Sequence, residues 1–391
     1  MSLVDVPFTA GTVEIRGALD LKPTADGLLP RRVPAWTAPQ IPDAFMDTVV
    51  TSTSGVRLVF RTTSPVVELT AHPMTVHVTS RDQVDPAVEL VVDGELVAMQ
   101  RMVGGTFIHI DQTRGPEGIT WEAGGPATVR FDDLGSGDKE VELWLPTHSS
   151  IELRRLAVAE GSSVSAPSRP RRRWVHHGSS ISHCMDVNRP SAAWPMLAAR
   201  LAGVDVDNYG FGGQCQLDPF MGRVLRDVPA DVMSLKVGIN LVNAASMSER
   251  TFGPALHGFL DSIRDGHPTT PLLVVSPIYC PSVEEHPGPT VPVLIDGRTT
   301  FVHVEARPAV RPLGLTLVRI REMVEQIVGA RRAAGDEHLH TFSGLDLFGA
   351  DDVDELYDRL HPTEEGYRRI GERFAAKAFG PGGPLAGTVG V

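Results

Sequence analysis

Hydrophobic positions in the first 160 residues recur with a period near two, which is the repeat of a β-strand that buries one face. Short β-branched runs, such as VRLVFRTTSPVVELTAH, AVELVVDGELVAMQRM and ATVRFDDL, are separated by Gly, Pro and Asp. The pair Asp93-Gly94 lies inside one of these runs and favours a two-residue hairpin turn. No helical pattern interrupts the runs. We therefore predict that residues 1–160 form an antiparallel, jelly-roll-like β-sandwich domain.

The segment 161–173 has the composition of a linker, because GSSVSAPSRPRRR is rich in Ser, Pro and Arg. Its arginines could instead form a patch that binds nucleic acid, but the chain as a whole is acidic. We interpret the segment as a solvated linker between two domains.

From residue 174 onward, apolar runs of strand length alternate with helical patterns. The runs are RWVHH, VDVDNY, DVMSLKVG, PLLVVSPIY and HLHTFS. This alternation is typical of a parallel sheet with helices on both faces, so residues 174–391 are expected to form one α/β domain. One helix is expected to have Ser191 as its N-cap, Pro195 in its first turn and Gly203 just past its end. The last helix is expected to follow an N-cap at Thr363.

A long Pro-rich stretch, which we interpret as a loop, runs from Cys280 to about Leu313. Loops of this length in compact domains are commonly lids or specificity loops. We therefore expect this segment to help enclose a substrate.

The composition is that of an ordinary globular protein, with 42% hydrophobic and 21% charged residues among 391. A formal net charge of −12 disfavours broad attraction to nucleic acid or anionic lipid. The N-terminus lacks the basic and apolar segments of a signal peptide, and no apolar run is long enough to span a bilayer. We therefore expect a cytoplasmic protein with neither nucleic-acid nor membrane partners. Cys184, Cys215 and Cys280 are widely spaced, which predicts buried free thiols.

Ligands of open parallel sheets bind beyond the carboxyl ends of the strands. Four polar segments lie at such positions here: Gly178-Ser179-Ser180 after the first predicted strand, NYGFGG (208–213) after the second, GIN (238–240) after the third, and DRLHP (358–362) before the last helix. A hydroxyl nucleophile, two candidate oxyanion donors and an Asp/His pair are therefore expected at one edge of the sheet.

In this chain order the four segments resemble the SGNH/GDSL hydrolase superfamily of GDSL-like lipases and acylhydrolases, which has a flavodoxin-like sheet. The resemblance covers roughly residues 170 to 380. It implies a catalytic triad of Ser180, His361 and Asp358. It also implies an oxyanion hole made by the backbone N–H groups of Ser180 and Gly213 and by the side-chain amide of Asn240.

Two positions depart from the family pattern. Ser179 stands where the family usually has Asp, and Leu241 follows Asn240 where Asp is common. Neither position supplies a triad or oxyanion group in the family, so the implied mechanism survives. The departures suggest a divergent branch.

The residue types suit this chemistry on physical grounds. A serine hydroxyl becomes a good nucleophile when a base within hydrogen-bond reach takes its proton, and the base needs a third group to fix its tautomer. Asp358 and His361 are three residues apart, so a tight turn can bring the carboxylate to one ring nitrogen while the other nitrogen faces Ser180.

Each candidate also has a purely structural interpretation: an N-cap at Ser180, a turn at Gly213, a helix cap at Asn240, and a structural pair of Asp358 and His361. His183 is a rival base, although helical spacing would carry it along the helix rather than toward the hydroxyl. His176 and His177 are neighbours on a strand and point to opposite faces, so they are not expected to share a metal. No metal site is predicted.

The predicted site supports acyl transfer through an acyl-enzyme on Ser180, with acyl-CoA as a possible co-substrate and no other cofactor. The two-domain layout and the run DGHPTTPLLVVSPIYCP resemble actinomycete acyltransferases of this superfamily that move a salicylyl group from its coenzyme A thioester to a tetracycline hydroxyl. This resemblance implies an acyl-CoA or acyl ester donor and a hydroxylated small-molecule acceptor, such as a polyketide. Two alternatives remain: an intracellular esterase acting on small or carbohydrate acyl esters, and a carbohydrate-binding protein with a vestigial site.

Overall fold

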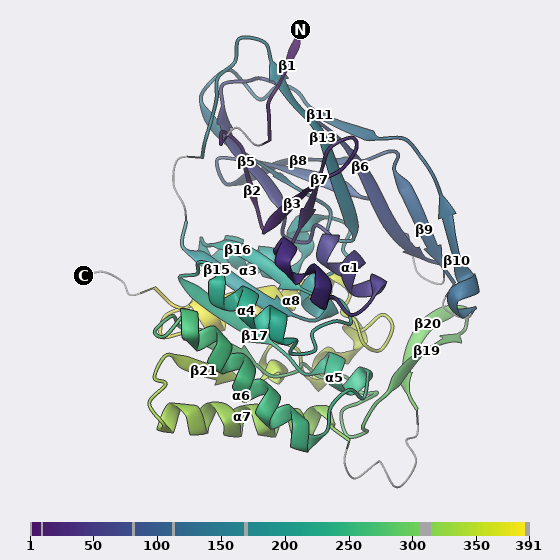
Figure 1. Cartoon of the computed structure of the whole chain (residues 1–391), viewed down its shortest axis with the longest axis vertical. Helices are drawn as coiled ribbons and strands as arrows, with labels where there is room; N and C mark the ends of the chain where they lie inside the picture. Colours follow the sequence, from purple (N-terminus) through teal and green to yellow (C-terminus); the bar gives the residue numbers. More distant parts are fainter. Residues whose placement is uncertain are drawn as a thin grey trace. The chain divides into compact units, whose positions relative to one another are not determined.

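A computed structural model of the chain (Figure 1) describes residues 2–8, 11–79, 83–111, 114–167, 171–304 and 314–387. The chain folds into two compact units. The first comprises Met1–Arg171 together with Met185–Ala192, and the second comprises Arg172–Cys184 together with Ala193–Val391. The change of unit after Arg171 falls inside the segment 161–173 that we expected to be a linker.

Two β-sheets build the first unit. One has the strand order β10-β9-β6-β13-β4-β3, with β1 added to β13 and β11 added to β6. The other has the order β14-β5-β12-β7-β8, with β2 added to β5. Their bounds are β1 (Leu3–Asp5), β2 (Glu14–Arg16), β3 (Asp20–Pro23), β4 (Leu28–Arg31), β5 (Arg57–Thr62), β6 (Val67–Val78), β7 (Ala87–Val92), β8 (Glu95–Arg101), β9 (Thr106–Ile110), β10 (Ile119–Glu122), β11 (Ala127–Phe131), β12 (Lys139–Trp144), β13 (Ser149–Ala159) and β14 (Val164–Ser165).

The predicted β-sandwich is confirmed, and alternation along the strands explains its core. Buried and half-buried residues alternate along β6, and inward side chains of both sheets form one apolar cluster that includes Phe60, Leu69 and Leu143. Asp93 and Gly94 both have positive φ and join β7 to β8 in the predicted hairpin. The strand pairs are antiparallel except for β6 and β9, which are parallel.

The first unit also contains helical segments that we did not predict: α1 (Ala44–Thr51), η1 (Ala35–Gln40) and η2 (Gly115–Gly118). The Asp43 side chain accepts the backbone N–H of Met46 at 2.7 Å and so caps α1. Eight residues are too few to establish a helical period against the surrounding strands, which is why the pattern missed α1. Strand β14 lies within the expected linker and pairs with β5, whereas residues 168–170 lie outside the described ranges.

The prediction that Ser191 caps a helix is wrong. Ser191 belongs to η3 (Pro190–Ala192), and helix α3 (Trp194–Ala202) follows Ala193 as its N-cap. Instead, the Glu89 carboxylate, only 1% exposed, accepts hydrogen bonds from Ser191 N–H at 2.6 Å and from Ser191 Oγ at 2.8 Å, and these bonds hold Ser191 in η3. Pro195 does lie in the first turn, and Gly203 ends the helix with φ 65°.

The second unit has a parallel sheet with the strand order β16-β15-β17-β18-β21, which is the flavodoxin-like order that the family resemblance implied. Every pair is parallel. The strands fall on the five predicted runs: β15 (Arg173–Gly178), β16 (Asp205–Gly210), β17 (Val232–Lys236), β18 (Leu272–Val275) and β21 (Leu339–Phe342). Strands β17 and β18 are buried throughout, as expected where helices cover both faces.

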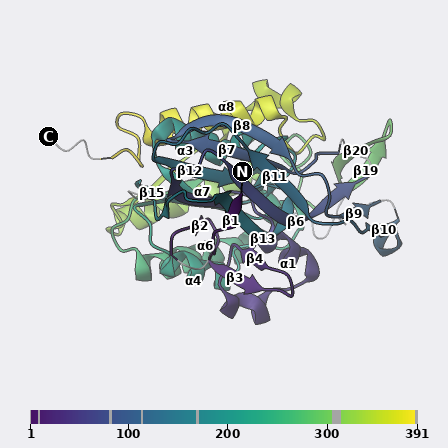
Figure 2. The same ribbon diagram turned by 90° about the horizontal axis from the view of Figure 1, so that it is seen from above.

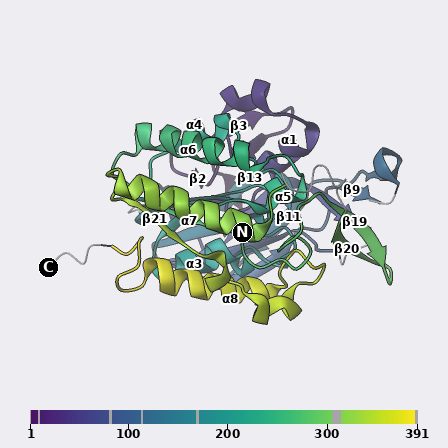
Figure 3. The same cartoon turned by 90° about the horizontal axis from the view of Figure 1, so that it is seen from below.

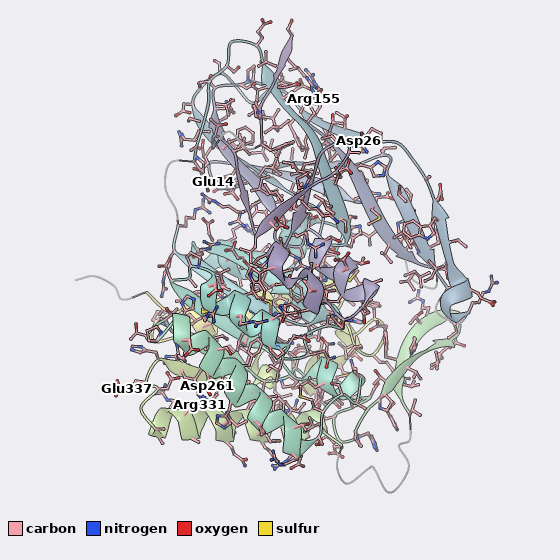
Figure 4. The ribbon with its side chains drawn as sticks, viewed as in Figure 1. Glu14, Asp26, Arg155, Asp261, Arg331 and Glu337 are labelled. Carbon is pink, nitrogen blue, oxygen red and sulfur yellow. The ribbon has the colours of Figure 1, made fainter. Side chains whose placement is uncertain are left out.

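Helices cover both faces of this sheet, as Figure 3 shows. One face carries α3 and α8 (Glu364–Phe374), and the other carries α4 (Pro219–Asp227), α6 (Glu249–Gly266) and α7 (Leu317–Ala333). The surface pair Arg331 of α7 and Asp261 of α6 links two of them at 2.7 Å (Figure 4). The shorter helical segments are α2 (Ser180–His183), α5 (Ile239–Asn243), η5 (Gly344–Asp346), η6 (Ala350–Glu355) and η7 (Ala375–Phe379). Within the described ranges, no helix is both long and apolar enough to cross a membrane.

The stretch 280–313, which we expected to be a loop, contains an antiparallel hairpin of β19 (Thr290–Ile295) and β20 (Arg298–His303), visible at the edge of the second unit in Figure 2. Asp296 and Gly297 form its turn with positive φ at both residues. The sequence VPVLIDGRTTFVH carries the same Asp-Gly signal as Asp93-Gly94, so this hairpin was predictable. Residues 305–313 lie outside the described part of the chain.

Candidate active site

A sharp turn between β15 and α2 presents Ser180 at the carboxyl edge of the parallel sheet. Ser179 is the N-cap of α2, and its Oγ accepts the Ile181 N–H at 3.4 Å. Ser180 is therefore the first helical residue rather than the N-cap, and it is partly exposed. This arrangement leaves its hydroxyl free of a capping role.

Two glycines allow α2 to pack directly on the strand ends. A Cβ placed on Gly178 would lie 2.4 Å from Ser182 Oγ, and one on Gly210 would lie 2.4 Å from the backbone N of His183. Both distances are far inside van der Waals contact, so a larger residue at either position would push the helix away. The glycine that ends the first predicted strand is thus required by the position of the nucleophile turn.

The structure brings Ser180, His361 and Asp358 together in one hydrogen-bonded chain. Ser180 Oγ lies 2.9 Å from His361 Nε2, and His361 Nδ1 lies 2.7 Å from Asp358 Oδ2. Asp358 and His361 are buried, at 2% and 7% exposure. With Nδ1–H donating to the carboxylate, Nε2 is left as the acceptor for the serine hydroxyl proton.

A tight turn holds the Asp358 carboxylate in place. Its Oδ1 accepts the backbone N–H of Leu360 at 3.0 Å and that of His361 at 2.7 Å. Arg359 adopts φ 65°, which folds the chain back on itself between the acid and the base. Because Oδ1 is occupied by backbone donors, Oδ2 is directed to the imidazole, and the pair is preorganised.

Hydrogen bonds also tie the two predicted oxyanion donors to the same edge. Gly213 is exposed and has φ 71°, a conformation that favours glycine. Asn240 lies in α5, whose N-cap is Gly238, so Asn240 is not a cap. Its Oδ1 accepts the Cys215 N–H at 3.1 Å, which fixes the amide orientation and leaves its N–H donors for a ligand. Phe211 N–H donates to the Gly178 carbonyl at 2.7 Å, which links this loop to the nucleophile turn.

A model of the GDSL-like lipase/acylhydrolase family matches residues 177–369. The matched segment begins at the nucleophile turn and contains all four blocks in their expected order. The second unit is a GDSL-like lipase/acylhydrolase domain. Its fold, its chain order and the hydrogen-bonded Ser180, His361 and Asp358 agree with that assignment.

Solved structures similar to the whole chain carry the same pair of folds. Salicylyl-acyltransferase SsfX3 from a tetracycline biosynthetic pathway matches with a TM-score of 0.77 and 27% identity over 95% of each chain. A putative GDSL-like lipase from Bacteroides ovatus matches with a TM-score of 0.65 and 19% identity over 95% of this chain and 96% of that one. A family two carbohydrate esterase from Clostridium thermocellum, in complex with cellohexaose, matches with a TM-score of 0.55 and 13% identity over 83% of this chain and 92% of that one.

The last two structures show the fold alone at these identities. The search of curated proteins gave no match. Together, the family and the similarity to SsfX3 support acyl transfer or ester hydrolysis by the GDSL-like domain.

The other histidines near the nucleophile have structural partners. His183 Nδ1 accepts the Gly212 N–H at 3.3 Å, which ties it to the loop that carries Gly213. His176 Nδ1 lies 2.7 Å from Ser234 Oγ, and its Nε2 lies 2.8 Å from the Oγ of Ser182, two residues after Ser180. Burial holds the pKa of His176 well below its usual range, so it stays neutral and joins α2 to the sheet.

His177 points away from His176, as predicted for neighbours on a strand. Its Nδ1 lies 2.7 Å from the Tyr209 carbonyl, and its Nε2 lies 3.5 Å from Cys215 Sγ. All three cysteines are buried and free, as predicted. Burial raises the pKa of Cys215 to about 12, so its thiol is not a rival nucleophile at neutral pH. In the described ranges, no three His, Cys, Asp or Glu side chains gather as metal ligands would.

Sequence reasoning missed Lys236, which lies at the carboxyl end of β17 beside Gly178 of β15. It is 2% exposed. Burial lowers its pKa to about 8. The sequence does indicate a buried lysine here, because Lys236 is the only lysine within the apolar run DVMSLKVG.

Gly178→Ala should lower kcat by about 100-fold, because the new Cβ displaces the helix that carries Ser180 and a shift near 1 Å suffices for such a loss. The measurement is steady-state ester hydrolysis together with urea unfolding. Gly258→Ala is the matched control, because a Cβ there meets nothing within 4 Å in α6. A Gly178→Ala variant with wild-type kcat would show that the close approach does not position the nucleophile.

Lys236→Met should raise the free energy of unfolding at pH 7, because the wild type holds a desolvated ammonium there. Between about pH 8 and the ordinary lysine value of 10.5, the unfolded chain binds a proton that the folded chain does not. Wild-type stability at this site therefore rises with pH, and the advantage of the variant should shrink over that interval. Urea unfolding at pH 7, 9 and 10 measures this, with Lys22→Met, an exposed site, as control. A constant difference would contradict the assignment.

Proposed function

We propose that this protein is an O-acyltransferase that moves an acyl group, preferably aromatic, from a coenzyme A thioester to a hydroxyl of a polyketide-like small molecule. The observation that carries the proposal is the hydrogen-bonded chain from Ser180 through His361 to Asp358. The 27% identity to a salicylyl-acyltransferase over 95% of both chains supports the choice of acyl group and acceptor.

The reaction has two halves. In the first, Ser180 Oγ attacks the thioester carbonyl while His361 Nε2 takes the hydroxyl proton, and the thiol leaves with that proton. In the second, the acceptor hydroxyl attacks the Ser180 ester, and its proton passes through His361 to Ser180 Oγ. In both halves, N–H groups of Ser180, Gly213 and Asn240 hold the carbonyl oxygen as it becomes negative. No cofactor other than the acyl-CoA co-substrate is needed.

Hydrolysis is the second candidate, because water attacking the same acyl-enzyme gives an esterase. The fold shared with a carbohydrate esterase keeps small and carbohydrate acyl esters among the substrates to be tested. The intact Ser180, His361 and Asp358 argue against a binding protein with a vestigial site.

Ser180→Ala should abolish acyl-enzyme formation, because it removes the hydroxyl that lies 2.9 Å from His361 Nε2. Intact-protein mass spectrometry after exposure to acetyl, aliphatic and aromatic acyl-CoA thioesters and to acetylated sugars measures the adduct. A wild-type adduct from an aromatic thioester, discharged faster by a polycyclic alcohol than by water, is the expected result. Turnover of acetylated sugars alone would indicate a carbohydrate esterase. An adduct that persists in Ser180→Ala would mean that another residue is the nucleophile.

Asn240→Asp should lower kcat by about 10²- to 10³-fold, the loss typical of one oxyanion donor. The aspartate keeps an oxygen for the Cys215 N–H but has no N–H donor, so the loop geometry survives while the oxyanion contact is lost. Single-turnover acylation by an aromatic thioester measures the effect, with Asn240→Ala as a second variant. Near-normal acylation in Asn240→Asp would remove Asn240 from the oxyanion hole.

A further inference from the structure

Two aromatic rings that the sequence did not single out lie against the imidazole of His361. The Tyr357 ring stacks on it with centroids 6.1 Å apart and planes at 22°. The Phe301 ring meets it edge-on at 5.8 Å and 73°. Tyr357 is 37% exposed and Phe301 is partly exposed, whereas His361 is buried. The two rings therefore offer surface to a molecule that approaches the base.

The backbone holds both rings at the base. Phe301 lies on β20, and its N–H donates to the Asp358 carbonyl at 3.1 Å. The Phe301 carbonyl accepts a hydrogen bond from Ser282 Oγ at 3.0 Å, and the Tyr357 N–H donates to the His361 carbonyl at 3.1 Å. The hairpin and the turn that carries the acid and base are thus one hydrogen-bonded assembly.

The geometry of acyl transfer places the acceptor alcohol beside these two rings. An incoming alcohol must place its hydroxyl at His361 Nε2, where the Ser180 hydroxyl lies before acylation. The acyl carbonyl oxygen instead faces the donors of Gly213 and Asn240. Side chains around His361 therefore contact the alcohol that enters and the group that leaves.

The hairpin extends the apolar surface away from the base. Pro292 pairs with Phe301 and Leu294 pairs with Thr299, so all four side chains share one face of the two-stranded sheet. Leu294 is 49% exposed on that face. Ile295, at 41% exposure, lies on the opposite face because side chains alternate along a strand.

We propose that Phe301, Tyr357 and Leu294 form the acceptor subsite and that it selects a planar, largely apolar alcohol or phenol over water and over small aliphatic alcohols. The inference rests on the proposed acyl-enzyme at Ser180. The acceptor oxygen forms a new ester bond to the acyl carbon, the bond from that carbon to Ser180 Oγ breaks, and the acceptor proton moves through His361 to Ser180.

A competition experiment tests the subsite. Vinyl benzoate supplies the acyl group, because its small leaving group makes little use of the aromatic surface. Ethanol and 2-naphthalenemethanol then compete with water for the same acyl-enzyme, and chromatography gives the ratio of naphthylmethyl ester to ethyl ester. Since both products form from one intermediate, this ratio does not depend on how much acyl-enzyme accumulates.

The wild type should favour 2-naphthalenemethanol, and Phe301→Ala or Tyr357→Ala should lower the product ratio by about tenfold, as expected for one lost aromatic contact. Leu294→Ala should lower it by about threefold, whereas Ile295→Ala on the opposite face should leave it unchanged. Phe301→Leu and Tyr357→Phe provide variants that keep apolar bulk and should retain most of the ratio.

Two results would overturn the subsite: no preference for 2-naphthalenemethanol in the wild type, or an equal loss of both ester products in the alanine variants. The second result would mean that the rings only hold His361. Failure of the proposed function has a different signature, because vinyl benzoate would then not be consumed in a Ser180-dependent manner even without an acceptor alcohol.

Discussion

The close approach of α2 to the ends of β15 and β16 is the constraint on which the site depends. At Gly178 and Gly210 the helix backbone and the Ser182 side chain occupy the space that a Cβ would need. The buried imidazole of His176 also holds α2 against the sheet, because it hydrogen-bonds to Ser182 of α2 and to Ser234 of the neighbouring strand β17. The direction of the Ser180 hydroxyl is therefore set by backbone packing and a buried polar contact rather than by a flexible loop.

The base reaches this hydroxyl from a point 181 positions further along the chain. Such a contact is useful only if both ends are rigid before substrate binds, because reorganisation during the reaction would add to the barrier. The turn from Asp358 to His361 meets this condition through its own backbone hydrogen bonds, and Thr363 then caps α8 by accepting the Gly366 N–H at 3.1 Å. Helix α8, which covers the sheet, and the turn that carries Asp358 and His361 thus fix one another.

The parallel sheet of the second unit and the placement of the four polar segments at its edge could be predicted, because both follow from general rules for α/β folds. Strand-length apolar runs alternate with helices, and functional residues collect where such strands end. The features that escaped prediction depend on tertiary partners. Ser191 is a residue type that caps helices, but its N–H and hydroxyl donate to the buried Glu89 carboxylate, which holds it in η3 before the N-cap of α3. Nothing local distinguishes Phe301 or Tyr357 from other aromatic residues until the hairpin of β19 and β20 joins the turn at Asp358.

The proposed triad would serve hydrolysis and transfer alike, so competition between water and the acceptor at His361 would decide between the two reactions. Water at about 55 M against an acceptor at about 1 mM has an advantage of roughly 10⁴ to 10⁵, which corresponds to about 6 to 7 kcal/mol at 1.4 kcal/mol per tenfold. Burying an aromatic ring of about 150 to 250 Å² contributes about 4 to 6 kcal/mol at 25 cal/mol per Å². Alignment of the bound hydroxyl with the base supplies the remainder. An apolar surface of the size of one or two side chains beside His361, together with this alignment, therefore offsets the concentration advantage of water.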